Sequence, residues 1–255
     1  MSDDDKLFRR LDRELSAQDF GGSTAGSESL DTYRQAARGY ALIEGAIAVL
    51  SDMTTGRSYV SHGSFGRTLG LAHSGGEMTV PSIWEDEILR LIHPDDLHAK
   101  YLDELRFFHH VRRLPRAQRA NSFLADKLRM RDTSGRWHTA LHRLHYVPAP
   151  GSNGLWLALC LYTPLTFDFT GTAIVVETAD GNITSLGTGH DNLILSQRER
   201  QVLRLIDRGM TSKDIAGCLS ISLNTVSRHR ASILARLRVG NSIEACRIAR
   251  ELGLV

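Results

Sequence analysis

The C-terminal stretch, residues 195–255, reads LSQRERQVLRLIDRGMTSKDIAGCLSISLNTVSRHRASILARLRVGNSIEACRIARELGLV. Three helix-start signals divide it. In the first, Ser196 and Glu199 have the spacing of a capping box, in which each side chain accepts a backbone amide of the other residue. Thr211 opens a second short helix, and Ser222 caps a third. These starts, separated by short connections, predict an all-helical domain that contains a helix-turn-helix.

The third helix of this stretch has one apolar face and one polar face. If Val226 is buried, then Ile233, Leu234 and Leu237 lie on the same side, at helical spacing. The opposite face is polar or small, which suits the major groove of DNA. Its candidate base-reading residues are Asn224, Ser227, Arg228 and Ala231. The candidate phosphate-contacting residues are Lys213, Thr225, His229 and Arg230.

These residues resemble the LuxR/FixJ-type (GerE-like) DNA-binding domain along the whole stretch. The resemblance is carried by LSQRE, the stop at Gly209, KDIA, the T-V-x-x-H-R of the third helix, and Asn241 before Glu244-Ala245. It implies four helices, of which the third enters the major groove and the fourth, residues 242–252, pairs two domains on a two-fold site. Ser227 departs from the lysine that is common in the family, so target sequences do not carry over.

Two other interpretations of this stretch have to be weighed. A sigma-factor DNA-binding region shares the central turn, but the fourth helix makes it a poorer match. A plain helical bundle with charged outer faces would explain the helices alone. The charge balance favours a polyanion partner: after residue 191 there are 11 Lys and Arg against 5 Asp and Glu, whereas the remainder has 20 basic and 24 acidic residues.

Residues 29–165 are expected to form a mixed domain with two strands, then helices, then three strands. Helical spacing marks 30–44, 83–91 and 95–111, and strand patterns mark 46–50, 58–61, 127–133, 137–147 and 155–162. The order resembles that of a PAS domain, through AIAVLSDMTTGRSYVS with Leu69-Gly70, the run IHPDDL, and KLRMRDTSGRW. The resemblance implies a half-barrel that binds a small molecule, a cofactor or a protein, and that often dimerises.

The strand at 155–162 is apolar on both faces, so both faces must be covered. One face is expected to form the wall of a ligand pocket beneath the helices; its residues are Leu155, Leu157, Leu159 and Leu161. The other face then needs the helix at 30–44 or a second chain; its residues are Trp156, Ala158, Cys160 and Tyr162.

The 255 residues therefore predict an α+β domain with an antiparallel PAS-like sheet, followed by an all-α four-helix domain. The expected boundaries are 1–28 for an N-terminal arm and flexible joint, 29–165 for the PAS-like domain, 166–192 for a hairpin and connector, and 193–255 for the DNA-binding domain.

Catalytic, metal and cofactor chemistry has no sequence signature in this chain. The 11 histidines include no HExxH pair, and the 3 cysteines include no CxxC pair. No GxSxG, Walker or Rossmann fingerprint is present. We therefore expect no enzymatic activity, metal site or cofactor. The acidic N-terminus has no signal peptide, and the longest apolar run is too short for a bilayer, so a cytoplasmic location without a membrane partner is expected.

These observations predict a sequence-specific transcriptional regulator whose PAS-like domain senses a small molecule or a partner and sets the geometry of a homodimer. The expected partners are double-stranded DNA and a second copy of the chain, with RNA polymerase and a small-molecule ligand as further candidates. One alternative is a protein–protein interaction module with a DNA-binding tail and no ligand sensing. Another is nonspecific nucleic-acid binding.

Overall fold

The computed structural model describes residues 3–20, 27–71, 77–165, 173–177, 183–185, 194–237, 239–251 and 254–255. The chain forms two compact units, the N-terminal unit Met1–Leu186 and the C-terminal unit Gly187–Val255. Among the described residues, no helix combines the length and the apolar character that crossing a bilayer requires. The turn expected at 179–182 and the connector at 187–192 lie outside the described residues. The predicted boundaries at residues 28, 165 and 192 stay predictions.

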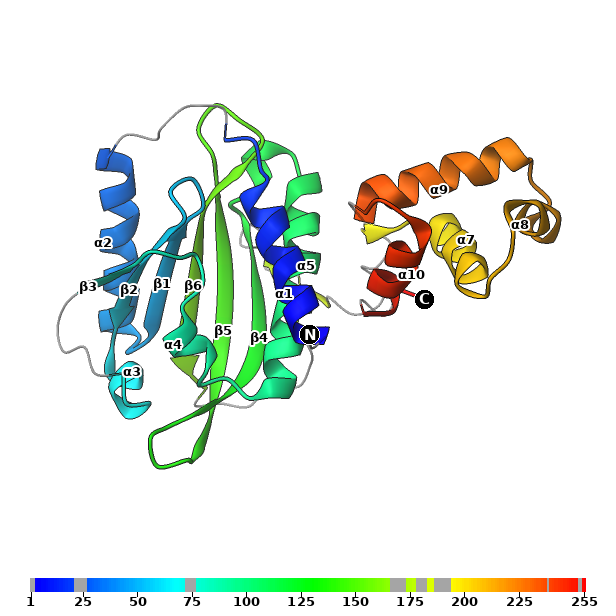
Figure 1. The fold of residues 1–255 in the computed structure, drawn as a ribbon. Coiled ribbons are helices and arrows are strands. Elements are labelled where there is room, and N and C mark those ends of the chain that lie inside the picture. Colours follow the sequence, from blue (N-terminus) through cyan, green and yellow to red (C-terminus); the bar gives the residue numbers. More distant parts are fainter. Residues whose placement is uncertain are drawn as a thin grey trace. The chain divides into compact units, whose positions relative to one another are not determined.

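The N-terminal unit is built on one antiparallel sheet (Figure 1). Its strands are β1 (Ile47–Asp52), β2 (Arg57–His62), β3 (Glu77–Val80), β4 (Ser122–Arg131), β5 (Trp137–Pro148), β6 (Leu155–Pro164), β7 (Ile174–Glu177) and β8 (Ile183–Ser185). They are ordered β3-β2-β1-β6-β5-β4-β7-β8. The β1–β2 hairpin therefore joins the β4–β5–β6 meander through β1 and β6, which is the expected PAS-like arrangement.

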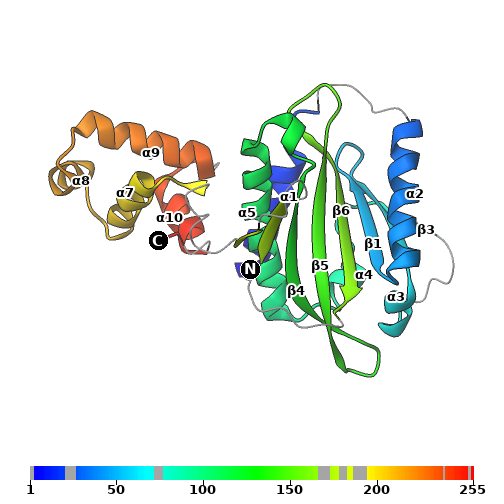
Figure 2. The same cartoon turned by 180° about the vertical axis from the view of Figure 1, so that it is seen from behind.

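Helices cover both faces of this sheet, as the two opposite views show (Figures 1 and 2). The helix α2 (Ser27–Ile43) packs on one face, where Ala37 and Ala41 contact the sheet residues Leu50 and Leu161. The opposite face is covered by α1 (Asp3–Ser16), α3 (Ser64–Thr68), α4 (Asp86–Leu89) and α5 (Pro94–Arg113), with a short 3-10 turn at Arg116–Gln118.

The prediction that the leucine face of β6 forms the wall of a ligand pocket is wrong. Leu157, Leu159 and Leu161 pack against α2, in the cluster that contains Ala37 and Ala41. The other face of β6 lies under the remaining helices, where Cys160 and Tyr162 pack with residues of α3 and α4. Burial alone could not assign the two faces, because both are apolar and both are covered.

A β-bulge further alters the alternation of side chains along β6. Leu157 lies opposite Val147, but Leu155, two residues earlier, lies opposite the adjacent Pro148. One extra residue in β6 locally disrupts the regular alternation of its side chains. Trp156 consequently joins Leu157 in the cluster beneath α2, although strict alternation would place them on opposite faces.

The N-terminal helix α1 is part of the core rather than a separate arm. Leu7, Leu11 and Leu15 are buried at helical spacing, so the amphipathic pattern in the sequence is satisfied within the chain. Asp12 accepts a hydrogen bond of 2.7 Å from the indole Nε1 of Trp84. After the helix, Gln18 accepts a 2.9 Å hydrogen bond from the backbone amide of Leu155. The joint expected at 21–29 falls mostly outside the described residues, and α2 begins at its end.

One strand and one helix differ from the sequence predictions. The edge strand β3 is not among the strands predicted from the sequence; it pairs with β2. The helix expected at 83–91 is limited to the short α4. The hairpin β7–β8 forms as expected, and β7 also pairs with β4, so this hairpin extends the sheet.

The described part of the C-terminal unit includes the helices α7 (Gln197–Asp207), α8 (Ser212–Leu219), α9 (Leu223–Leu237) and α10 (Ser242–Glu251). Its core is apolar and comes from all four; it includes Val202, Leu203, Ile215, Val226, Ile233, Leu237, Ala245 and Ala249. The expected all-α four-helix fold is thus present.

Candidate functional site

The start of α7 connects two helices of the C-terminal unit through one carboxylate. Glu199 and Ser196 form the expected capping box, with 2.7 Å from Ser196 N to Glu199 Oε2 and 3.3 Å from Glu199 N to Ser196 Oγ. The other oxygen of Glu199 accepts a 2.5 Å hydrogen bond from Ser232 Oγ and lies 3.2 Å from Arg236 Nε, both on α9. Desolvation raises the pKa of Glu199, but the hydrogen bonds from Ser232 and Ser196 and the charge of Arg236 outweigh it, and the pKa is lowered.

The connection between α8 and α9 has the tight geometry of a helix-turn-helix. A second capping box joins Thr211 and Asp214 at the start of α8. The helix ends at Ser220, whose φ of 53° lies in the left-handed region. The amide of Ile221 then bonds to the carbonyl of Ala216 at 3.0 Å, which closes the turn. The hydroxyl of Ser222 accepts the amide of Thr225 at 3.1 Å, as the predicted cap of α9 requires.

The helix α9 separates its buried and exposed faces as its sequence predicts. Val226, Ile233 and Leu237 are buried, and Leu234 is half-buried. The four candidate base-reading residues, Asn224, Ser227, Arg228 and Ala231, are all exposed. Their spacing of three, four and seven residues places them on one face of the helix. The structure therefore presents them together on a polar surface at the N-terminal part of α9, and we call this surface the reading face.

The candidate phosphate-contacting residues are less uniform. Lys213 is exposed on α8, whereas Thr225, His229 and Arg230 are half-buried. The hydroxyl of Thr225 shares a 2.9 Å hydrogen bond with that of Ser222. Arg230 donates to Ser212 Oγ at 3.2 Å and to Ser242 Oγ at 2.9 Å, so it joins the first residues of α8 and α10. A positioning role for Arg230 is therefore visible in the structure besides any contact with DNA.

Two further contacts of the C-terminal unit have no signal in the sequence. Arg198 donates a 2.9 Å hydrogen bond to the carbonyl of Leu219, which holds the last turn of α8 against α7. Arg236 reaches Glu199 across the core, as described above. Both residues are arginines on helical faces, and their sequence spacing of more than twenty residues gives no hint of these pairings. Only the folded arrangement of α7, α8 and α9 brings them together.

The N-terminal unit has a small cavity on the face of the sheet opposite α2, with mostly apolar walls and a few polar side chains among them. About 30 Å³ of it is open to the centre of a water molecule, and its lining includes Ser51, Glu85, Lys100, Glu104 and Cys160. The Nζ atom of Lys100 lies 2.6 Å from Glu104 Oε1. Burial raises the pKa of Glu85 to about 7, and the hydrogen bonds from Ser58 and Ser51 and the charge of Lys100 oppose this only in part.

Comparison with known proteins identifies the C-terminal helices. The family described as "Bacterial regulatory proteins, luxR family" matches residues 193–249. The uncharacterized response regulatory protein YgeK of Escherichia coli (strain K12) is 40% identical over 60 residues, which are 24% of this chain and 41% of that protein. The transcriptional regulatory protein UhpA of the same organism is 43% identical over 53 residues, 21% of this chain and 27% of UhpA. This chain thus spans less than half the length of either relative.

A comparison of structures extends over most of the chain at low similarity. The crystal structure of the phage VqmA-DPO complex has a TM-score of 0.33 and 18% sequence identity, over 89% of this chain and 91% of that one.

The helix caps, the turn after α8 and the exposed face of α9 lie inside the stretch that the family matches. The C-terminal domain of this chain belongs to the luxR family of bacterial regulatory proteins.

Proposed function

We propose that this chain is a sequence-specific DNA-binding transcriptional regulator. The observation that carries the proposal is the reading face, because four small or polar side chains are exposed on the side of α9 opposite its buried residues. The major groove is about 12 Å wide and admits one α-helix. Arginine binds the O6 and N7 atoms of guanine with two hydrogen bonds, so Arg228 is the proposed main determinant of sequence preference.

Replacing Arg228 by alanine is expected to reduce the preference for a selected duplex over single-base variants by about 1–3 kcal/mol, because a two-pronged contact with guanine is lost. The measurement is a competition titration at constant salt. Arg204→Ala is the matched control, since Arg204 is exposed on α7 and carries the same charge. The control should bind all the duplexes in the original order of preference. An unchanged preference in Arg228→Ala would remove this residue from base recognition.

Replacing Lys213 by alanine is expected to weaken binding equally on every duplex. An exposed lysine that neutralises one phosphate contributes about 0.9 to the slope of log K against log salt concentration, so the variant should lose about that much slope. The measurement is a salt series on a selected duplex and on an unrelated one. A loss confined to the selected duplex would contradict the assignment to the phosphate backbone.

We propose a homodimer in which α10 pairs two C-terminal domains. Ile243, near the start of α10, has 85% of its surface exposed, which is unusual for a large apolar residue of a folded domain. Two such domains would place their reading faces on half-sites separated by about one helical turn of DNA.

Selection of bound fragments from the genome of the source organism tests the proposed function as a whole. A shared motif with two-fold symmetry is expected if the dimer reads sequence. Equal recovery of all duplexes at physiological salt would favour nonspecific nucleic-acid binding instead.

The N-terminal unit is proposed to receive the signal that controls DNA binding. An input that binds one arrangement of the dimer more tightly than another shifts the population toward that arrangement. Its PAS-like sheet supports an input by a small molecule. The competing proposal is a protein–protein interaction module that senses no ligand. Mass spectrometry of small molecules retained by the full chain after incubation with metabolite extracts separates the two, because only the sensor should retain one.

A further inference from the structure

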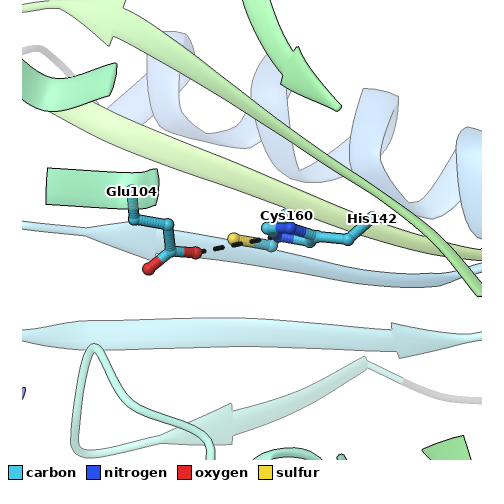
Figure 3. A group of neighbouring side chains, drawn as sticks. All are labelled: Glu104, His142 and Cys160. Carbon is cyan, nitrogen blue, oxygen red and sulfur yellow. Dashed lines mark ion pairs between the residues drawn. The ribbon is translucent and has the colours of Figure 1, made fainter. Parts of the chain in front are cut away.

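Three side chains with metal-ligand chemistry meet inside the N-terminal unit. Glu104 comes from α5, His142 from β5 and Cys160 from β6, and their side chains point toward one another (Figure 3). One carboxylate oxygen, one imidazole nitrogen and the thiol sulfur all lie within 4.8 Å of one another. In the β5–β6 register Cys160 faces Leu144, two residues from His142, so the two ligands are diagonal neighbours on one sheet face.

His142 is oriented in the way that metal-binding histidines are usually oriented. Its side chain is fully buried, and its Nδ1 lies 3.0 Å from the Oδ1 atom of Asp126. An Nδ1–H group that donates to a carboxylate leaves a lone pair on Nε2, and this carboxylate contact is typical of histidines that ligate metals. Nε2 makes no hydrogen bond with the described residues and lies 3.8 Å from Glu104 Oε1. A buried nitrogen that makes no hydrogen bond lowers the stability of the fold unless it gains a hydrogen-bond donor or a metal ion as its partner.

We propose that Glu104, His142 and Cys160 bind a divalent transition-metal ion, with Zn²⁺ as the expected occupant. Zinc accepts carboxylate, imidazole and thiolate ligands, whereas Mg²⁺ and Ca²⁺ prefer oxygen ligands throughout. Tetrahedral zinc with bonds of about 2.0–2.3 Å holds neighbouring ligand atoms about 3.3–3.7 Å apart. The 3.8 Å between His142 Nε2 and Glu104 Oε1 already approaches this value. Cys160 binds as the thiolate, and its proton is released to solvent.

The surrounding charges accommodate a dication. The carboxylate of Glu104 and the thiolate of Cys160 together neutralise it. Lys100, whose Nζ atom now contacts Glu104 Oε1 at 2.6 Å, lines the same cavity as the carboxyl group of Glu85. Glu85 can therefore offset the charge of Lys100 while the oxygens of Glu104 face the metal. Lys100 still competes for the same oxygen atom, so the affinity should rise when this lysine is removed.

The cavity beside these residues provides a fourth coordination position. About 30 Å³ of it is open to the centre of a water molecule, and its walls include Glu104 and Cys160. A water molecule needs roughly 10–15 Å³ by this measure. Three protein ligands and one water complete a tetrahedral site, as in zinc sites that exchange their fourth ligand.

Cobalt titration of the reduced, chelator-treated full chain tests the site. Binding to Cys160 should produce a thiolate-to-Co²⁺ charge-transfer absorption in the near ultraviolet that saturates at one ion per chain and disappears on addition of Zn²⁺. Cys160→Ser should abolish this absorption. Cys218→Ser is the matched control and should leave it unchanged, since Cys218 is exposed on α8 in the other unit. Asp126→Asn, which removes the carboxylate that orients His142 and leaves all three ligands in place, should weaken the affinity about 10- to 100-fold.

The unmodified chain keeps the proposal falsifiable if Cys160→Ser does not fold, as judged by circular dichroism, because its own charge-transfer absorption is the first readout. Lys100→Met retains all three ligands and, in a folded sample, should bind Co²⁺ more tightly than the unmodified chain. Absence of the charge-transfer absorption in the unmodified chain at millimolar Co²⁺ would overturn the proposal, and so would its persistence in folded Cys160→Ser. DNA binding, measured on the same samples, reports separately on the function proposed for the C-terminal unit.

Discussion

Replacing Glu104 by alanine is expected to lower the free energy of unfolding of the N-terminal unit by about 3–5 kcal/mol in metal-free buffer, the usual cost of breaking a buried ion pair from one side. The side chains of Lys100 and Glu104 are only 3% and 6% exposed, and they meet at 2.6 Å. The substitution leaves a buried ammonium group without its carboxylate. Chemical denaturation in the presence of a chelator, followed by the fluorescence of the three tryptophans, all of which lie in the N-terminal unit, measures the loss.

The pH range over which the Lys100–Glu104 pair stabilises the fold follows from the pKa of Lys100. Burial is the largest single influence and lowers the pKa of Lys100, but the charges of Glu104, Tyr162 and Cys160 and the hydrogen bond to Glu104 together outweigh it, and the net pKa is raised well above its ordinary value. A raised pKa means that the pair stabilises the fold fully at pH values below the ordinary lysine pKa of about 10.4 and loses this contribution only as the pH rises through the folded-state value. The stabilisation that the pair gives to the unmodified chain should therefore be the same throughout the neutral range.

Two control variants test whether the loss of stability arises because the Lys100–Glu104 pair is buried. Asp86→Ala removes an i,i+4 pair with Arg90, in which the side chains are 77% and 78% exposed, and should cost less than about 1 kcal/mol. The double variant Lys100→Met/Glu104→Met removes both charges together and should recover most of the lost stability. If Glu104→Ala costs no more than Asp86→Ala, the pair does not have the buried environment described for it.

Replacing Gly63 by alanine should destabilise the N-terminal unit by about 3 kcal/mol, at the upper end of the usual cost of overpacking. A Cβ atom at this position would lie 2.1 Å from the carbonyl oxygen of Ala41 and 2.4 Å from the carbonyl carbon of Gly45. Both are backbone atoms, so no side chain can rotate away. The chain must separate the end of α2 from the start of α3, and the 2.6 Å hydrogen bond from Gly63 N to Ala46 O would be strained.

The matched substitution Gly39→Ala is expected to have the opposite sign. Gly39 lies inside α2, and an added Cβ would meet no atom within 4 Å. Alanine is favoured over glycine in a helix interior by about 1 kcal/mol, so this variant should be more stable than the unmodified chain. Thermal unfolding of the two variants side by side is the measurement. A neutral Gly63→Ala would show that the end of α2 is not packed against this residue.

Most elements of the fold can be predicted from local patterns. The helix α5 begins at Pro94, with the side chain of His93 accepting the amide of Asp95, and such a start is visible in the sequence. The meander β4–β6 alternates strongly enough to be recognised, and Leu128 and Met130 are buried on one face of β4 as expected. The edge strand β3 was missed because its four residues EMTV are too few for their alternation of polar and apolar side chains to mark a strand, and none of them is fully buried.

The reading face was predictable for the same reason. Capping boxes act over three residues, and the exposed face of α9 repeats over three and four residues, so both are properties of short segments. The roles of Arg230, Arg198 and Arg236 were not predictable, because each depends on a partner at least twelve residues away in the sequence.

By itself, the sequence determined where most of the helices and strands of this protein form and which surface of α9 faces outward, because hydrogen-bonded turns and side-chain periodicity depend on neighbouring residues. Only the tertiary structure decided which apolar face of β6 lies beneath α2 and that Glu104, His142 and Cys160 meet on the other face. Those outcomes depend on how elements far apart in the sequence pack against one another. Both faces of β6 are apolar, so burying either of them beneath α2 removes the same kind of surface from water, and the sequence pattern does not choose between them.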